Sequence, residues 1–195
     1  MGDKYHSFSA LAAENVAGVD YRISTRTAPH RHLVVVAPHG GSIERRTSEI
    51  ASALAKDDYS LYLFEGMDPN GSFDTLHITS HRFDEPSCIQ LVEKFSRVIS
   101  VHGCTGEGEE IYLGGLDVEL RHQLHESLTQ AGLATHNEGH KFQGTHSKNI
   151  CNLGLRKQGV QIEFSDGMRG APRETLAIEI IRQTLCAANL AVGSD

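Results

Sequence analysis

The sequence predicts an α/β fold, in which β-strands and helices alternate along the chain. Two observations support this class: runs of β-branched residues alternate with amphipathic stretches, and the apolar spacing switches between strand and helix periods along the chain. A length of 195 residues suits one hydrophobic core, and we find no repeat, low-complexity segment or linker. We therefore expect a single domain over residues 1–195.

The first half of the chain contains the clearest strand. The run HLVVVA is continuous and β-branched, which is typical of a strand in the middle of a sheet. Ile43, Ile50 and Leu54 then recur at helical spacing, so the chain turns from strand to helix across the letters PHGG. A loop rich in turn-forming residues covers 67–74. In order, we expect helix 8–16, strands 20–27 and 32–37, helix 42–56, and strands 59–66 and 75–83.

The second half has well-marked helix ends. Pro86 stands near a helix N-terminus, where its missing N–H costs nothing, and Gly132 stops a long amphipathic helix. Residues 136–155 are rich in His, Asn and Gly and show no clear period, so we expect an irregular segment there. In order, we expect helix 85–95, strands 97–104 and 110–115, helix 116–132, strand 159–165 and helix 171–192.

Composition excludes several classes of function. The net charge of −7 argues against general nucleic-acid binding. No apolar run approaches the roughly 20 residues needed to cross a bilayer, and the N-terminus lacks the apolar core of a signal peptide. The four cysteines are far apart, which indicates reduced thiols. We expect a cytoplasmic protein without membrane or nucleic-acid partners, as a monomer or weak oligomer.

Two buried strands each end on a histidine followed by glycine. His39 and His102 stand at these ends, and ligands of open α/β sheets bind where the carboxyl ends of strands meet. Glu44 follows His39 across two glycines, so its carboxylate can fold back toward the imidazole. Two imidazoles and one carboxylate with an open fourth position form a catalytic zinc set. The alternative is structural: hydrogen-bonded histidines and a carboxylate favoured by a helix dipole.

Glu163 is the candidate general base. Strand alternation places Gln161, Glu163 and Ser165 on one side of the last strand and its apolar residues on the other. A carboxylate beside a metal site would accept a proton from an attacking water. The alternative is an ordinary polar face of the strand.

Five motifs resemble a known family. In order they read APHGGSIE, SVHGC, IYLGGLD, NICN and GVQIEFSDGMR, and together they are similar to the phage poly-γ-glutamate hydrolases, which also occur in bacterial genomes as phage-related "replication" proteins. The resemblance spans residues 33–169. It implies a zinc carboxypeptidase-like core, in which a mixed, twisted β-sheet lies between helices on both faces and gives three layers. It also implies an enzyme that cuts γ-glutamyl amide bonds, and release by host lysis if the gene is viral. It also implies one Zn²⁺ per chain on His39, Glu44 and His102, with Glu163 as the base.

An anionic polymer or a small amide as substrate requires local positive charge and polar groups. Arginine suits this role because its planar fork binds carboxylates in pairs. Asparagine would orient a carboxylate or amide, and a histidine would serve as an accessory acid. The candidate substrate-binding residues are Arg169, Arg82, Arg156, Asn149, Asn152 and His140.

Other functions remain open from the sequence. VVVAPHGG also resembles the strand-end histidine of sugar N-deacetylases and N-formylglutamate amidohydrolases, so a zinc amidohydrolase acting on a small N-acyl substrate is one alternative. A non-catalytic phage-related metal-binding protein is another. Cys104, two residues after His102, suggests a cysteine nucleophile, but the sequence offers it no clearly positioned base.

Overall fold

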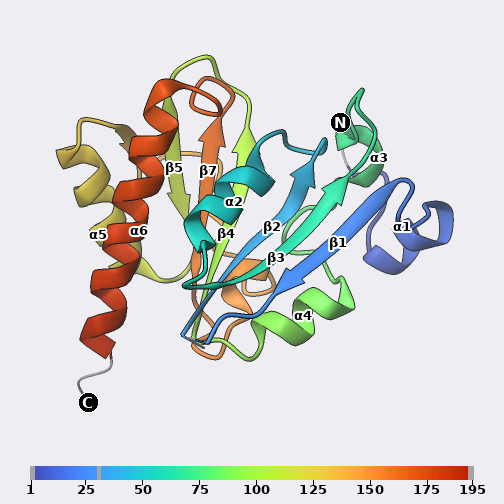
Figure 1. Ribbon diagram of the computed structural model, residues 1–195, viewed down its shortest axis with the longest axis horizontal. Coiled ribbons are helices and arrows are strands. Elements are labelled where there is room, and N and C mark those ends of the chain that lie inside the picture. The colour runs from blue at the N-terminus through green and yellow to red at the C-terminus, as the bar shows by residue number, and fades with distance from the viewer. Residues whose placement is uncertain (1–2, 30–31, 193–195) are drawn as a thin grey trace.

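The computed structural model describes residues 3–29 and 32–192 and has the expected three-layer α/β architecture (Figure 1). Its seven-stranded mixed sheet has the order β1-β3-β2-β4-β7-β5-β6. The central strands β3, β2, β4 and β7 run parallel, whereas β1 and β5 are antiparallel to their neighbours β3 and β7. The strands are β1 (Tyr21–Arg26), β2 (Leu33–Gly41), β3 (Ser60–Gly66), β4 (Arg97–Cys104), β5 (Glu110–Gly114), β6 (Ala134–His136) and β7 (Val160–Ser165).

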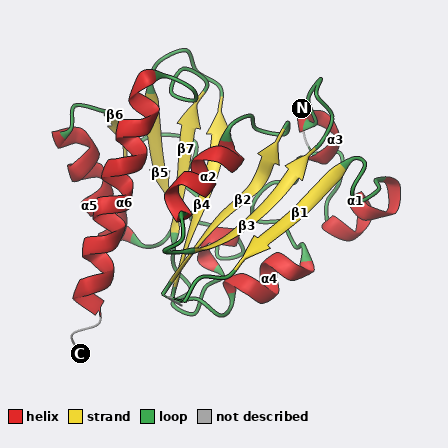
Figure 2. Cartoon of the chain, in the orientation of Figure 1, coloured by secondary structure: helices red, strands yellow, loops and turns green. Residues whose placement is uncertain are grey.

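Helices cover both faces of this sheet (Figure 2). One apolar core joins the sheet to α2, α5 and α6, and a second joins it to α1, α3 and α4. Alternation along β2 explains the two cores, because Val35 faces the first and Val34 and Val36 face the second. The helices are α1 (Phe8–Glu14), α2 (Thr47–Ala55), α3 (Phe73–Leu76), α4 (Pro86–Val92), α5 (Val118–Gln130) and α6 (Pro172–Val192), with a 3₁₀ turn η1 (Ile150–Asn152).

The expected strand over 75–83 is wrong. The short helix α3 and an irregular segment occupy this stretch instead. Leu76, Ile78 and Phe83 are buried in the second core, so their apolar pattern reflects burial and not sheet pairing. Backbone groups of this segment bond outside the sheet: Ile78 O to a ring nitrogen of His39, and Ser80 O to the N–H of Ile150.

Two further features differ from the sequence expectation. Helix α2 begins at Thr47, because residues 42–46 form turns, and β6 and η1 are short elements that the sequence did not indicate. Among the described helices, none is both long enough and apolar enough to cross a membrane.

Candidate metal centre

The candidate site lies where β2, β4 and β7 end, in a pocket of about 530 Å³. Because β4 and β7 are parallel and in register, His102 stands directly beside Glu163. The β2–β3 register shifts between Ala37 and Gly40, and a bulge of this kind re-aims the side chain that it contains, here His39. The backbone then turns back, and the Glu44 N–H donates to His39 O at 3.0 Å.

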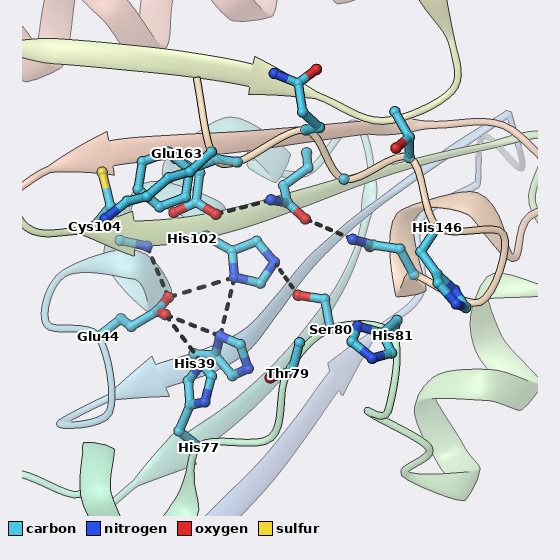
Figure 3. Close-up of a pocket in the computed structure, with 18 of the residues that line it drawn as sticks. His39, Glu44, His77, Thr79, Ser80, His81, His102, Cys104, His146 and Glu163 are labelled. Carbon is cyan, nitrogen blue, oxygen red and sulfur yellow. Dashed lines mark hydrogen bonds and ion pairs between the residues drawn. The ribbon is translucent and has the colours of Figure 1, made fainter. Parts of the chain in front are cut away.

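His39, Glu44 and His102 meet in this pocket (Figure 3). His39 Nδ1 lies 3.1 Å from Glu44 Oε1 and 3.1 Å from His102 Nδ1. The distance from His102 Nδ1 to Glu44 Oε2 is 3.6 Å. The Gly103 N–H also donates to Glu44 Oε2 at 2.8 Å, which orients the carboxylate. Three side chains that could ligate a metal, from separate segments of the chain, therefore converge on one point.

His77 is a fourth member of the cluster that sequence reasoning missed. Its Nε2 lies 3.8 Å from Glu44 Oε1, and its ring packs at a tilt against His39, with centroids 4.1 Å apart. His39, Glu44 and His77 each offer one ligand atom, and these atoms lie within 4.8 Å of one another. Since the segment around His77 resembled a strand, no sequence signal linked this residue to the site.

The chemistry of these donors fits a cation. His39 Nε2 lies 2.8 Å from Ile78 O, which can only accept, so the Nε2–H donates and Nδ1 keeps its lone pair. His77 Nδ1–H likewise donates to the Asp3 carboxylate at 2.7 Å, which leaves the lone pair on Nε2. Ser80 Oγ, 3.2 Å from His102 Nε2, can accept from it and so free Nδ1 of His102. Lone pairs and a carboxylate that face one another in a buried space are the donor set of a metal site.

Burial and neighbouring charges shift the acids and bases of the cluster. Burial acts to raise the pKa of Glu44, but the His39 and His102 rings outweigh burial and hold this pKa well below its usual value. Burial lowers the pKa of His77 to about 4, and the neighbouring His39 ring adds to this effect. At neutral pH the site therefore combines an ionised carboxylate with a neutral His77 imidazole.

Glu163 lines the same pocket and is only 6% exposed, so the ordinary polar face considered from the sequence does not apply. Burial, followed by the Glu44 carboxylate, raises the pKa of Glu163 to about 8. The expected alternation holds, since Val160, Ile162 and Phe164 belong to the core on the opposite face.

Two amides orient Glu163. The Asn149 Nδ2–H donates to Gln161 Oε1 at 2.8 Å, and the Gln161 Nε2–H donates to Glu163 Oε1 at 2.9 Å. The Cys151 N–H donates to Asn149 Oδ1, which fixes the direction of the whole chain of bonds. Asn149 thus lies in the pocket as predicted, but its amide is bonded to Gln161.

Of the three predicted arginines, Arg82 lines a side pocket that shares His77 and His81 with the main one. Arg169 is not in the main pocket lining, but it lies at the edge of the pocket, since it donates to Cys104 O and its charge acts to lower the pKa of Glu163. It also pairs with Asp166. Arg156 pairs with Asp117 at 3.8 Å, away from the pocket.

His140 and Asn152 have structural partners. His140 Nε2 contacts Leu113 O at 3.1 Å, and its Nδ1 accepts from the Phe142 N–H. Asn152 donates to Gly144 O and His146 O, and its own oxygen accepts two backbone N–H groups. These bonds hold the loop that forms one wall of the pocket.

The same pocket wall contains groups that the sequence analysis did not select. Lys141, His81 and His146 line it, and the rings of His81 and His146 lie 4.8 Å apart. Cys104 is also in the lining, but burial and then the charge of Glu163 raise the pKa of its thiol to about 12. A thiol with so high a pKa is a poor nucleophile, which argues against the cysteine alternative.

Comparisons with known proteins agree with the fold and the motifs. Residues 5–184 match the profile of a family described as poly-gamma-glutamate hydrolase. The chain is 39% identical over 169 residues to the SPbeta prophage-derived UPF0714 protein YoqZ of Bacillus subtilis strain 168, which covers 86% of this chain. It spans only 60% of the length of that relative.

Solved structures of related proteins share this fold. A bacteriophage poly-gamma-glutamate hydrolase superposes with a TM-score of 0.90 and 29% identity over 96% of this chain and 98% of the other. YndL in a zinc-free apo form gives a TM-score of 0.87 and 33% identity over 95% and 98%. An N-formylglutamate amidohydrolase from Ralstonia eutropha JMP134 shares the fold at a TM-score of 0.53 and 11% identity, over 86% and 97%.

Proposed function

Because the chain belongs to the poly-γ-glutamate hydrolase family, we propose that it hydrolyses γ-glutamyl amide bonds of poly-γ-glutamate with one Zn²⁺ per chain. The observation that carries this proposal is the convergence of His39, Glu44 and His102 beside a buried Glu163 in one pocket. A related structure described as zinc-free YndL supports zinc as the metal.

The proposal gives the four residues two kinds of role. The zinc would be held by His39, Glu44 and His102, with His77 beside them. Zinc at this position would supply Lewis acidity toward water and an amide carbonyl. Glu163 accepts the proton of the attacking water and passes it to the leaving amine, and Gln161 keeps the carboxylate turned toward the pocket.

Cationic groups around the pocket suit a polyanionic substrate. Lys141 lines the main pocket, and Arg82 lines the adjoining side pocket. In an acidic protein with net charge −7, such local positive charge is needed to bind a carboxylate-rich polymer. We propose Arg82 and Lys141 as substrate-binding residues, because both line these pockets.

The test combines metal analysis with substrate size analysis. The purified chain is freed of metal with a chelator, reloaded with zinc, and incubated with poly-γ-glutamate, whose length is followed by size-exclusion chromatography. We expect the polymer to shorten only with the zinc-loaded protein, and His39→Ala to abolish both zinc binding and cleavage.

A substrate panel separates the proposal from its alternatives. Cleavage of N-formyl amino acids or N-acetyl sugars in preference to γ-glutamyl peptides would replace the substrate assignment and leave the metal site intact. Zinc binding without turnover on any of these compounds would indicate a non-catalytic metal-binding protein.

A further inference from the structure

The N-terminal arm of the chain, here residues 3–8, reaches the candidate metal centre. The described chain begins beside α3 (Figure 1), and the side chain of Asp3 is only 6% exposed. Its Oδ1 accepts the Nδ1–H of His77 at 2.7 Å. Its Oδ2 accepts the backbone N–H of Thr79 at 2.9 Å and the Thr79 hydroxyl at 2.7 Å. One buried carboxylate therefore accepts three hydrogen bonds from a segment more than 70 residues away.

The bond to His77 determines which nitrogen that ring presents to the site. An ionised carboxylate only accepts hydrogen bonds, so Nδ1 carries the proton and Nε2 turns its lone pair toward Glu44. The ring is also confined from both sides, by His39 with centroids 4.1 Å apart and by Phe73 at 4.5 Å. Asp3 thus sets both the tautomer and the orientation of His77.

The bonds to Thr79 extend this effect to the other two histidines. Ile78 and Ser80 flank Thr79, and both contact the cluster: Ile78 O lies 2.8 Å from His39 Nε2, and Ser80 Oγ lies 3.2 Å from His102 Nε2. The segment 77–80 has irregular backbone: the His77 N–H donates to Phe73 O at the end of α3, Ser80 O accepts the N–H of Ile150, and Asp3 holds the Thr79 N–H between them. Figure 3 shows Ser80 beside His102 and Thr79 beside His39.

We propose that Asp3 is a positioning residue for the metal centre: through His77 and the segment 77–80, it holds the histidine rings in the orientation that binds zinc. This inference rests on the proposed function, because it takes zinc as the ligand of the cluster. A carboxylate that accepts a hydrogen bond from the second ring nitrogen of a histidine at a metal site typically raises metal affinity about 10–100-fold.

The N-terminal arm offers a matched control. The Asp84 carboxylate accepts the N–H of Phe8 and so anchors the same arm, but Asp84 is exposed and contacts none of the histidines. Asp84→Asn and Asp3→Asn each remove one charge and weaken one anchor of the arm. Only the change at Asp3 alters groups that contact the metal centre.

The experiment measures zinc affinity by competition with a chromophoric chelator. We expect Asp3→Asn to weaken zinc binding about 10–100-fold, while Asp84→Asn leaves it at the wild-type value. In a double-mutant cycle, Asp3→Asn should cost much less affinity when His77 is already alanine, because the two residues act together. Thermal unfolding of the metal-free variants reports separately on any general loss of stability.

The outcomes are distinct. Equal zinc affinity in Asp3→Asn and the wild type overturns this inference and leaves the proposed function standing. An equal loss in Asp84→Asn also overturns it, since the arm would then act by docking alone. An undiminished loss in the His77→Ala background overturns the part of the inference that runs through His77. A wild-type protein that binds no zinc overturns the metal centre itself, and both proposals fall.

Discussion

The Nδ1 atoms of His39 and His102 lie 3.1 Å apart, although 63 residues separate the two histidines in the sequence. His39 Nδ1 has no proton to offer, because the Nε2–H already donates to Ile78 O. His102 can donate from Nδ1 in the absence of metal, with the Ser80 hydroxyl donating to its other nitrogen. A cation would take the place of the proton on His102 Nδ1, and the Nε2–H of His102 would then donate to Ser80 Oγ, without either ring having to move. The arrangement therefore suits a bound metal.

The first prediction separates ligands from supporting residues. Since both Nδ1 atoms and Glu44 form the tightest contacts, His39→Ala, Glu44→Ala and His102→Ala should each abolish stoichiometric zinc after dialysis. His77→Ala should keep zinc with an affinity lowered about 10–100-fold, as expected of a neighbouring group. Elemental analysis and calorimetric titration measure both quantities. If His77→Ala loses zinc and His102→Ala retains it, the ligand set is instead His39, Glu44 and His77.

The second prediction concerns proton transfer. Glu163→Gln preserves the shape of the side chain and its bond to Gln161 but cannot accept a proton, so kcat/KM on poly-γ-glutamate should fall about 10²- to 10⁴-fold. Zinc affinity should not fall. Glu110→Gln is the control, because Glu110 bonds to Tyr112 and His136 outside the pocket. A Glu163→Gln protein with wild-type turnover would show that another group is the base.

The third prediction tests the direction of the hydrogen bonds that run from Asn149 through Gln161 to Glu163. In Asn149→Asp, the new carboxylate has no N–H for Gln161, so the Gln161 amide would turn its oxygen toward Glu163. Losing a hydrogen bond to a charged group costs about 1.5–3 kcal/mol, which corresponds to a rise of about one to two units in the pKa of Glu163. The acidic limb of the plot of hydrolysis rate against pH should therefore shift to higher pH, and the zinc affinity should stay unchanged.

Asn149→Ala provides the comparison for that variant. It removes one bond but leaves Gln161 free to donate to Glu163, so its pH profile should shift less. Equal profiles for the two variants would mean that Asn149 merely fills space.

The contrast between His39 and His77 shows what the sequence could and could not predict. His39 and His102 were predictable because a buried β-branched run fixes each strand, and parallel strands end at the same edge of the sheet. His77 was not, because its position depends on contacts with Asp3 and His39 that no local pattern encodes. The surroundings of the arginines were predictable only in part: Arg156 pairs with Asp117, which lies close only in the folded chain, whereas Arg169 pairs with Asp166 three residues before it.

The glycines between His39 and Glu44 give a fourth prediction. Gly41 has a φ of +62°, and a Cβ there would lie 2.4 Å from Gly66 O, a backbone atom that cannot easily move. Gly41→Ala should therefore lower the free energy of unfolding by more than about 1–3 kcal/mol, the cost of backbone strain alone. Gly18→Ala is the matched control, because Gly18 has a φ of +83° with open space around it. Equal losses in chemical denaturation would contradict the close-approach argument.

The last prediction concerns the stability of the metal-free protein against pH. The pKa of Glu163 is about 8 in the folded chain, above the ordinary value of 4.5, so the folded state keeps a proton that the unfolded state releases in this interval. Stability from this group is therefore present below pH 4.5 and is lost as the pH rises toward 8, by at most about 1.4 kcal/mol per pH unit. His77, with a pKa lowered to about 4 from 6.5, acts in the opposite sense below pH 6.5. The fall due to Glu163 should accordingly appear most clearly between pH 6.5 and 8.

Urea unfolding in the presence of a chelator, at several pH values, measures this effect. The free energy of unfolding should fall over this interval in the wild type and change less with pH in Glu163→Gln. Parallel curves for the two proteins would show that Glu163 is already ionised in the folded chain.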